Sequence, residues 1–154
     1  MPDSKRQKII DLAVVLMQTI RTANGYQTEL GEHVEDWRVN WDDSELPALS
    51  VCDTVADENL ANNEPSASLQ TNRLPLLFRI FVKSDTSAAD LRKMIADVKM
   101  ALKTNLRWND GTTDLAMWTL PSGSGIVVPT ESFEIAGAEI RVEISYLTES
   151  FSEF

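Results

Sequence analysis

Cysteine and histidine are almost absent from this chain, which has Cys52 and His33 as its single examples. One cysteine cannot form an internal disulfide, and one histidine with one cysteine cannot supply the four ligands of a structural zinc site. Cys52 follows Val51 in an extended run, so we expect it to be a small, unreactive core residue. His33 lies between Glu32 and Glu35 with no nucleophile nearby. We interpret it as a polar residue leading into a strand rather than as a general base.

Glycine is also scarce, with six residues in total. The chain has no GxGxxG, P-loop, HExxH or CxxC pattern, and no Ser/His/Asp order flanked by glycines. The segment PSGSG at residues 121–125 could form a small anion-binding nest, but it is more typical of a hairpin turn. Asp42, Asp43 and Glu45 could serve hydrolysis or hold a divalent ion, yet acids this close together are typical of a turn. We therefore expect no catalytic residues, no cofactor and no metal.

Basic residues are outnumbered, with 14 Lys and Arg against 24 Asp and Glu, for a net charge of −10. This balance disfavours tight nucleic-acid binding, which relies on Lys and Arg to displace counterions. Eleven acids between Glu29 and Glu64 are opposed by Arg38 alone, whereas residues 92–107 carry five basic side chains. Such a chain can join copies of itself head to tail in a ring, although an ordinary solvated surface explains the same charges.

Long apolar runs are missing as well, and no basic segment precedes an apolar one as in a signal peptide. We therefore expect a cytosolic protein without a membrane segment. With 154 residues, 43% of them hydrophobic, the chain fits a single domain spanning residues 1–154. A chain of this length buries roughly two thirds of its unfolded surface.

Two segments have the apolar spacing of helices. The first begins after Asp3 or Ser4 and is predicted to stop at Asn24-Gly25. The second begins at Thr86 or Ser87, and its apolar stripe runs from residue 91 to 102. Both are amphipathic, so they are expected to pack on one face of a sheet.

Six segments have the patterns of strands. The first starts at Val34, where Trp37 and Trp41 share a predicted core face, and it forms a hairpin with the second, Leu46–Asp53. Leu74–Lys83 is apolar on both faces, which is typical of a central strand. Three further strands follow at residues 115–120, 126–135 and 138–148. The order α-β-β-β-α-β-β-β predicts an α+β fold, a two-layer sandwich whose mostly antiparallel mixed sheet carries two helices on one face.

A long polar stretch, residues 53–73, separates strands 2 and 3. It has neither a helical apolar period nor a glycine, and a structureless loop of this length is normally functional or disordered. We expect a projecting arm that touches other proteins. The arm contributes these candidate contact residues: Asp57, Glu58, Asn62, Glu64 and Arg73.

Aromatic residues near the second half of the sheet supply the other candidate contacts. Trp118 lies on a strand that is apolar on both faces, and Trp108 precedes that strand. A sheet covered by helices on one face needs one apolar side, so a second apolar side suggests burial by another chain. The alternative is that both tryptophans cap the helix layer. Phe151 and Phe154 in the tail, residues 149–154, could dock into a neighbour or simply fray.

Several motifs follow one another in the order seen in one family. They are GYQTELG at residues 25–31, ELPALSV at 45–51, RIFV at 79–82, DVKMAL at 97–102 and VEISYLT at 142–148. In this succession the chain resembles the tail terminator, or tail-completion, proteins of long-tailed bacteriophages. The resemblance spans most of the chain and is weakest in the arm and after residue 148.

The resemblance implies a non-enzymatic virion protein at the neck end of the tail, assembled in the host cytoplasm. It implies a hexameric ring that caps the tail tube, stops its elongation and offers a docking surface to the head connector. The partners would be other copies of the chain, the tube protein, the neck protein and, in a contractile tail, the sheath. DNA would pass through the pore without specific binding. Three alternatives remain: another neck or head-completion ring subunit, a monomeric binding module, and a hydrolase using Asp42, Asp43 and Glu45.

Overall fold

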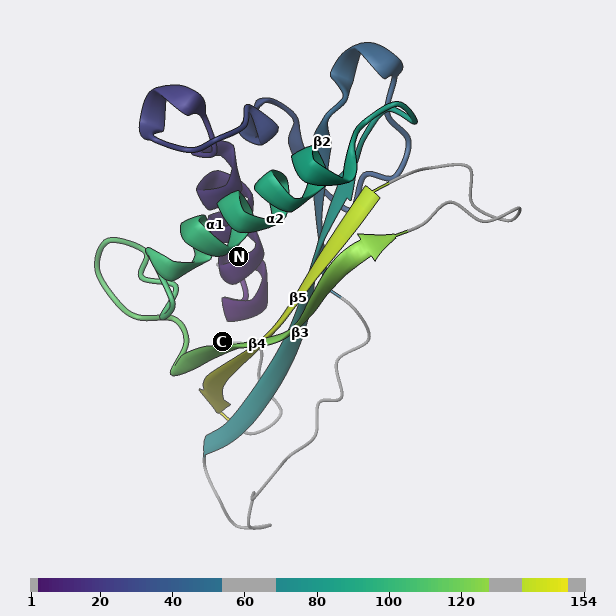
Figure 1. Ribbon diagram of the computed structural model, residues 1–154. Helices are drawn as coiled ribbons and strands as arrows, with labels where there is room; N and C mark the ends of the chain where they lie inside the picture. Colours follow the sequence, from purple (N-terminus) through teal and green to yellow (C-terminus); the bar gives the residue numbers. More distant parts are fainter. Residues whose placement is uncertain (1–2, 54–68, 128–136, 150–154) are drawn as a thin grey trace.

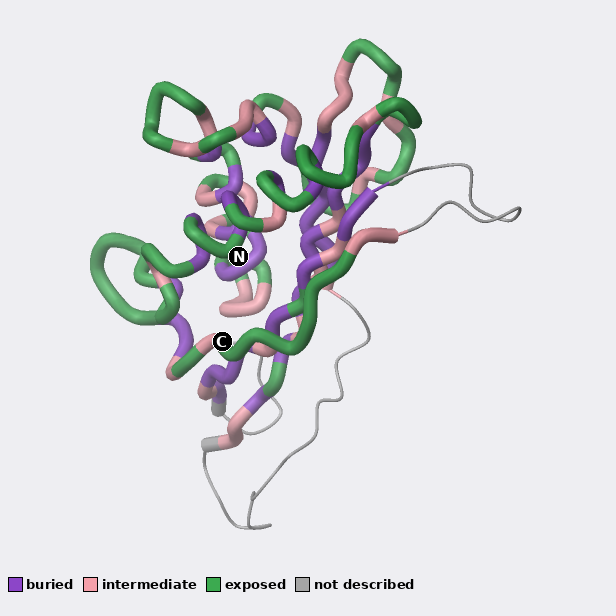
Figure 2. The backbone as a smooth tube through the Cα atoms, viewed as in Figure 1, coloured by how far each residue is buried: buried purple, intermediate pink, exposed green. Residues whose placement is uncertain are grey.

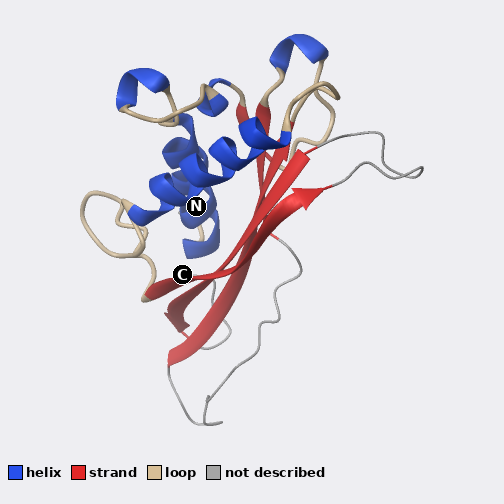
Figure 3. Cartoon of the chain, viewed as in Figure 1, coloured by secondary structure: helices blue, strands red, loops and turns tan. Residues whose placement is uncertain are grey.

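The computed structural model describes residues 3–53, 69–127 and 137–149 (Figure 1). Two helices and five strands make up these ranges. The elements are α1 (Lys5–Gln18), β1 (Val34–Asp36), β2 (Ala48–Asp53), β3 (Leu69–Phe81), α2 (Ala88–Lys103), β4 (Trp118–Val127) and β5 (Gly137–Glu149), with three short 3-10 turns, η1 (Thr22–Asn24), η2 (Leu30–Glu32) and η3 (Asp43–Glu45). The two helices lie on the same side of the sheet (Figure 3). The predicted α+β sandwich is therefore confirmed.

The sheet has the strand order β1-β2-β3-β5-β4. All neighbouring strands are antiparallel except β1 and β2, which run parallel. β3 lies in the middle, as its two apolar faces predict, and it pairs with β5 over its whole length from Leu69 to Phe81. Gly137, at the start of β5, is required there because a Cβ would lie 2.2 Å from the carbonyl oxygen of Ile80.

Both helices begin where the sequence predicts. The Ser4 hydroxyl oxygen accepts a hydrogen bond from the Gln7 amide at 3.1 Å, and that of Ser87 accepts one from the Asp90 amide at 3.2 Å. The expected stop of the first helix is wrong, because α1 already ends at Gln18. The left-handed Gly25, with φ of 90°, instead ends the separate 3-10 turn η1.

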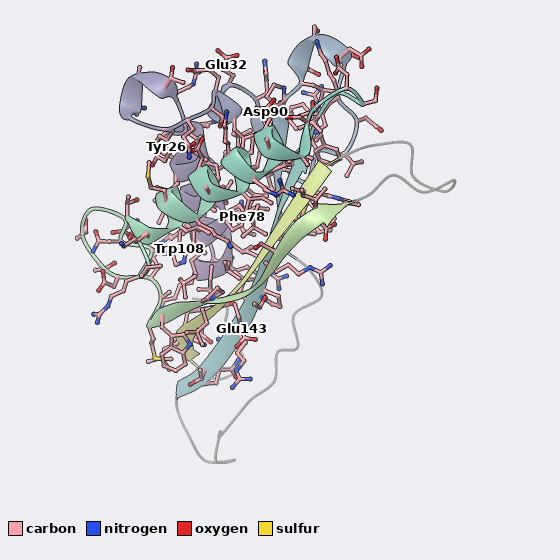
Figure 4. The ribbon with its side chains drawn as sticks, in the orientation of Figure 1. Tyr26, Glu32, Phe78, Asp90, Trp108 and Glu143 are labelled. Carbon is pink, nitrogen blue, oxygen red and sulfur yellow. The ribbon has the colours of Figure 1, made fainter. Side chains whose placement is uncertain are left out.

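The core lies between the helices and the inner face of the sheet, which is the face that the helices cover. Phe78 on β3 sits at its centre and is fully buried, while Glu143 on β5 projects from the opposite face (Figure 4). The helices contribute Ile9, Ile10, Ala13, Met17, Leu91, Met94, Val98, Ala101 and Leu102 to this core, and β5 contributes Ile140, Val142, Ile144 and Tyr146. The one-sided pattern predicted for the last strand is thus confirmed.

A buried carboxylate ties two distant segments together. Asp97 on α2 is 1% exposed, and its oxygens accept hydrogen bonds from the Gln27 amide at 3.1 Å and the Thr28 amide at 2.9 Å. The Thr28 hydroxyl donates a further bond at 2.7 Å. These groups belong to the GYQTELG and DVKMAL motifs of the sequence. The contact fixes the loop after η1 against the helix layer.

The predicted first hairpin is wrong. β1 ends after three residues and lies parallel to β2, with Val34 opposite Leu49. Trp37, predicted to continue the strand into the core, has a left-handed φ of 53° and is 54% exposed. Trp41 is half-buried and packs beside Phe81 with ring centroids 6.4 Å apart. Two tryptophans at alternate positions therefore do not share a buried strand face here.

The predicted turn at residues 121–125 is also wrong. Pro121 and Gly123 lie inside β4, where the pairing with β5 shifts register between them. A proline and a bulge of this kind are tolerated because β4 is an edge strand. β4 therefore joins residues from both of the strands expected at 115–120 and 126–135, and residues 128–136 lie outside the described ranges.

Cys52 is buried on β2, as expected. Burial raises the pKa of its thiol from 9.0 to about 11, and the nearby Arg79 opposes this rise. Because the folded chain holds the Cys52 proton more tightly than the unfolded chain does, the raised pKa contributes to the free energy of unfolding in full below pH 9. That stabilisation is lost between pH 9 and pH 11, where the unfolded thiol ionises and the folded one does not.

We predict that Cys52 in the folded chain reacts with iodoacetamide at pH 8 at least about 100 times more slowly than in urea-unfolded chain. The physical reasons are its burial and its small thiolate fraction. Mass spectrometry of timed samples gives the two rates, and a free cysteine peptide with the same neighbours is the control. Equal rates in the folded and unfolded chain would contradict this account.

No helix within the described ranges is both long and apolar enough to span a membrane.

Candidate interaction surface

The sheet has an outer face, defined as the face turned away from α1 and α2, that no described helix covers (Figure 3). Paired residues of an antiparallel ladder project to the same face. Trp118 pairs with Ser145 and Leu120 pairs with Glu143, and these positions alternate with the buried Ile144. Trp118 and Leu120 therefore lie on the outer face, where they are 45% and 52% exposed. β4 is exposed along most of its length (Figure 2).

Charged side chains share the outer face with these apolar ones. Arg73 lies 3.7 Å from Glu143, and Arg79 lies 3.5 Å from Glu139. Partly exposed ion pairs of this kind contribute about 0–1 kcal/mol each. Arg73, a predicted contact residue, is thus on the open face of the sheet, and it belongs to β3 rather than to the arm.

Trp108 is fully buried, so the prediction that it contacts a partner is wrong. The alternative, that it caps the helix layer, is confirmed. Its indole nitrogen donates to the Thr119 hydroxyl at 2.8 Å, and this hydroxyl donates to the Leu106 carbonyl at 2.7 Å. Trp108 thereby joins the end of α2 to the start of β4 (Figure 4).

The remaining predicted contact residues fall outside the described ranges. They are Asp57, Glu58, Asn62 and Glu64 of the arm, and Phe151 and Phe154 of the tail. The arm itself is shorter than predicted, since residues 69–73 already belong to β3.

A groove runs between the last turns of α2 and the edge strand β4. It encloses about 360 Å³, and we call it the basic groove. Apolar side chains form its floor, and Lys99 and Lys103 on α2 are the basic side chains beside it. The floor includes Leu102, Leu106, Pro121, Ile140 and Val142. Leu106 is 46% exposed, so some of the apolar floor is open to solvent. The sequence shows the basic residues of α2, but it does not show that the end of α2 leaves a hollow against β4 and β5.

The opposite edge of the sheet is acidic. Glu35 and Asp36 on β1 are exposed, and the chain continues into Trp37 and Val39, which are 54% and 44% exposed. We call residues 35–39 the acidic projection. The indole nitrogen of Trp37 donates to Asp53 at 2.6 Å, which fixes the ring. Partial burial, with the neighbouring carboxylates of Asp53 and Asp11, raises the pKa of Asp36.

The acids proposed for hydrolysis form a turn instead. The Asp42 amide donates to Glu45 at 2.9 Å, and the two residues make a reciprocal capping box around η3. Arg38 lies 2.7 Å from the same Glu45 carboxylate. The Asp42 amide and then Arg38 lower the pKa of Glu45. Within the described residues, no group of His, Cys, Asp and Glu is arranged to hold a metal ion.

Comparison with models of known protein families finds no family that matches this chain, and comparison with curated protein sequences finds no match.

Proposed function

We propose that this chain is a structural subunit of a phage tail, a tail terminator that closes into a ring on the tail tube. The ring, of six copies by the resemblance, would stop tube growth and then receive the head connector. The observation that supports the proposal most directly is the β4 side of the outer face, which no described helix covers. It presents Trp118 and Leu120 next to each other along an edge strand.

An exposed tryptophan beside another apolar side chain is typical of a protein contact surface. Tryptophan is enriched among the residues that dominate binding energy, and it loses most by remaining in water. Trp118 and Leu120 are two residues apart on β4 and therefore form one continuous apolar strip on the outer face. A subunit that lays this strip against its neighbour buries surface that its own helices leave open.

The charge of the chain is compatible with a pore through which DNA slides. With a net charge of −10, the surface repels phosphates on average, so DNA can pass without being held. A related neck or head-completion ring would share this property and is the nearest alternative. A monomeric binding module is less consistent with the strip, because it would leave the strip in water.

The test is to add the purified chain to its cognate tube subunits during polymerisation and to measure tube lengths by negative-stain electron microscopy. We predict that the chain arrests growth, and that Trp118→Ser with Leu120→Ser raises the concentration needed for arrest at least about tenfold. Val15→Ser is the matched control, because Val15 is 59% exposed but lies on α1.

Tubes that grow equally long with and without the unmodified chain would refute the terminator. If the chain instead forms rings that bind the connector and ignore the tube, the neck subunit is the correct assignment. Native mass spectrometry of the chain alone and of chain released from capped tubes gives the number of copies.

A further inference from the structure

The basic groove carries positive charge that the described residues neutralise incompletely. Lys99 and Lys103 are exposed and lie one helical turn apart on α2, and neither forms an ion pair with a described residue. Arg141 also lines the groove, but its side chain pairs with Glu139 at 3.1 Å on the outer face, so the two lysines supply the charge of the groove. In a chain with a net charge of −10, this is a local excess of positive charge above an apolar floor. Its natural ligand is an acidic segment that carries an apolar side chain.

The acidic projection has that chemistry. Residues 35–39 carry Glu35 and Asp36 against Arg38, which pairs with Glu35 at 3.1 Å, and between Glu29 and Asp53 the sequence has eight acidic residues and this one basic residue. Trp37 emerges from the middle of this region, half exposed and held by Asp53. A left-handed backbone is uncommon for a bulky residue and costs on the order of 1 kcal/mol, so an exposed aromatic kept in it is a candidate contact residue.

The two features cannot meet within one chain. β1 and β4 are the opposite edges of the sheet, separated by β2, β3 and β5. Four inter-strand spacings of about 4.8 Å place these edges roughly 19 Å apart. A contact between the acidic projection and the basic groove must therefore form between two copies of the chain.

We infer that the basic groove of one copy receives the acidic projection of the next, with Trp37 inserted over the apolar floor. Glu35 and Asp36 then lie near Lys99 and Lys103 of the receiving copy. The contact joins two different surfaces, so repeating it produces a head-to-tail arrangement that can close into a ring. This inference rests on the proposed ring and identifies the contact that holds it together.

The dimensions agree with this arrangement. A volume of about 360 Å³ accommodates an indole ring with neighbouring atoms, and burying a tryptophan removes about 150–250 Å² from water. The hydrogen bond from Trp37 to Asp53 orients the ring before binding, which lowers the entropic cost of the contact. Because the carboxylates and ammonium groups are exposed before association, the contact should weaken with added salt.

The first experiment is disulfide cross-linking between copies of the full-length chain. Val39→Cys chains are mixed with Leu106→Cys chains and oxidised, and the covalent dimer is measured on a non-reducing gel. The native Cys52 is buried and contributes little background. Val39→Cys mixed with Val15→Cys is the matched control, because Val15 is exposed on α1 away from the groove. We expect a dimer from the first mixture in at least tenfold excess over the second.

The second experiment is a charge exchange, measured by sedimentation velocity. Lys99→Glu with Lys103→Glu should weaken self-association at least tenfold, and Glu35→Lys with Asp36→Lys should do the same. Mixing the two variants should restore association, because opposite charges then face each other again. Arg92→Glu with Lys93→Glu makes the same charge change elsewhere on α2 and should have no effect.

The outcomes separate this contact from the proposed function. Capped tubes without the Val39–Leu106 cross-link, or with association unchanged by both charge variants, overturn the groove contact and leave the terminator standing. Cross-linked chains with charge rescue that fail to arrest tube growth support the contact and refute the terminator.

Discussion

Replacing Trp108 by alanine is expected to lower the free energy of unfolding by about 4 kcal/mol. Trp108 is fully buried between the end of α2 and the start of β4, so the truncated side chain leaves a large cavity. The substitution also removes the indole donor to Thr119, whose hydroxyl bonds to the Leu106 carbonyl. Both Thr119 and Leu106 line the basic groove, so this substitution also loosens the groove wall.

Urea unfolding followed by far-ultraviolet circular dichroism measures the effect. Trp118→Ala is the matched control, because the same truncation at a 45% exposed site should cost less than about 1 kcal/mol. Trp108→Phe keeps most of the packing and should cost about 2 kcal/mol, from the lost hydrogen bond and the smaller ring. Equal losses from Trp108→Ala and Trp118→Ala would show that the burial of Trp108 has been misassigned.

Asp97→Ala is expected to cost about 3 kcal/mol of unfolding free energy. The substitution leaves the amides of Gln27 and Thr28 without the buried acceptor that they share in the native fold. An unsatisfied donor costs about 1–3 kcal/mol when it is buried, and water recovers part of this cost at Gln27, which is exposed. The same urea titration measures it, together with faster hydrogen exchange at these two amides.

Two further variants test whether the loss of stability comes from the buried Asp97 carboxylate. Thr28→Val removes the hydroxyl bond and leaves the amide bonds, so it should cost about 1 kcal/mol. Asp90→Asn changes an exposed acid in the first turn of the same helix and should stay within about 0.5 kcal/mol. If Asp97→Ala is no more destabilising than Asp90→Asn, the carboxylate does not anchor the loop.

Much of the fold can be predicted from the sequence, because helix caps and the spacing of apolar residues act within a single element. Ser4 and Ser87 precede amphipathic segments, and each caps its helix as predicted. The two-sided apolar run around Phe78 predicts a central strand, and alternation in Ile140–Tyr146 predicts a one-sided one. In each case the residues of a single helix or strand are enough to predict where that element begins or which of its faces is buried.

The sequence predictions fail where the structure of a segment depends on which strand it pairs with or on a single backbone angle. Alternation from Val34 to Trp41 predicts a hairpin, but the left-handed turn at Trp37 ends β1 and leaves a parallel pair. Pro121 with two nearby glycines predicts a turn, yet on an edge strand the missing proline amide has no ladder bond to lose. Neither outcome can be seen without knowing which strands lie side by side.

The candidate surface is only partly predictable from the sequence. An apolar second face on the strand at residues 115–120 predicts that Trp118 is left open by its own chain, and it is 45% exposed. The same argument fails for Trp108, because its burial depends on the chain crossing from α2 back to β4. Periodicity places Trp37 in the core, where it does not lie, and the basic stretch at residues 92–107 does not show that two of its lysines border a groove.

The interrupted edge of β4 has a consequence for how copies of the chain can add to one another. Pro121 lacks an amide hydrogen, and the bulge beside it breaks the regular spacing of donors and acceptors. A further strand therefore cannot pair with β4 along the whole length of this edge. This blocks the open-ended addition of strands that leads to fibrils. Another copy of the chain that binds at this side must therefore be recognised through complementary side chains. Contacts of that kind can produce an assembly with a fixed number of copies.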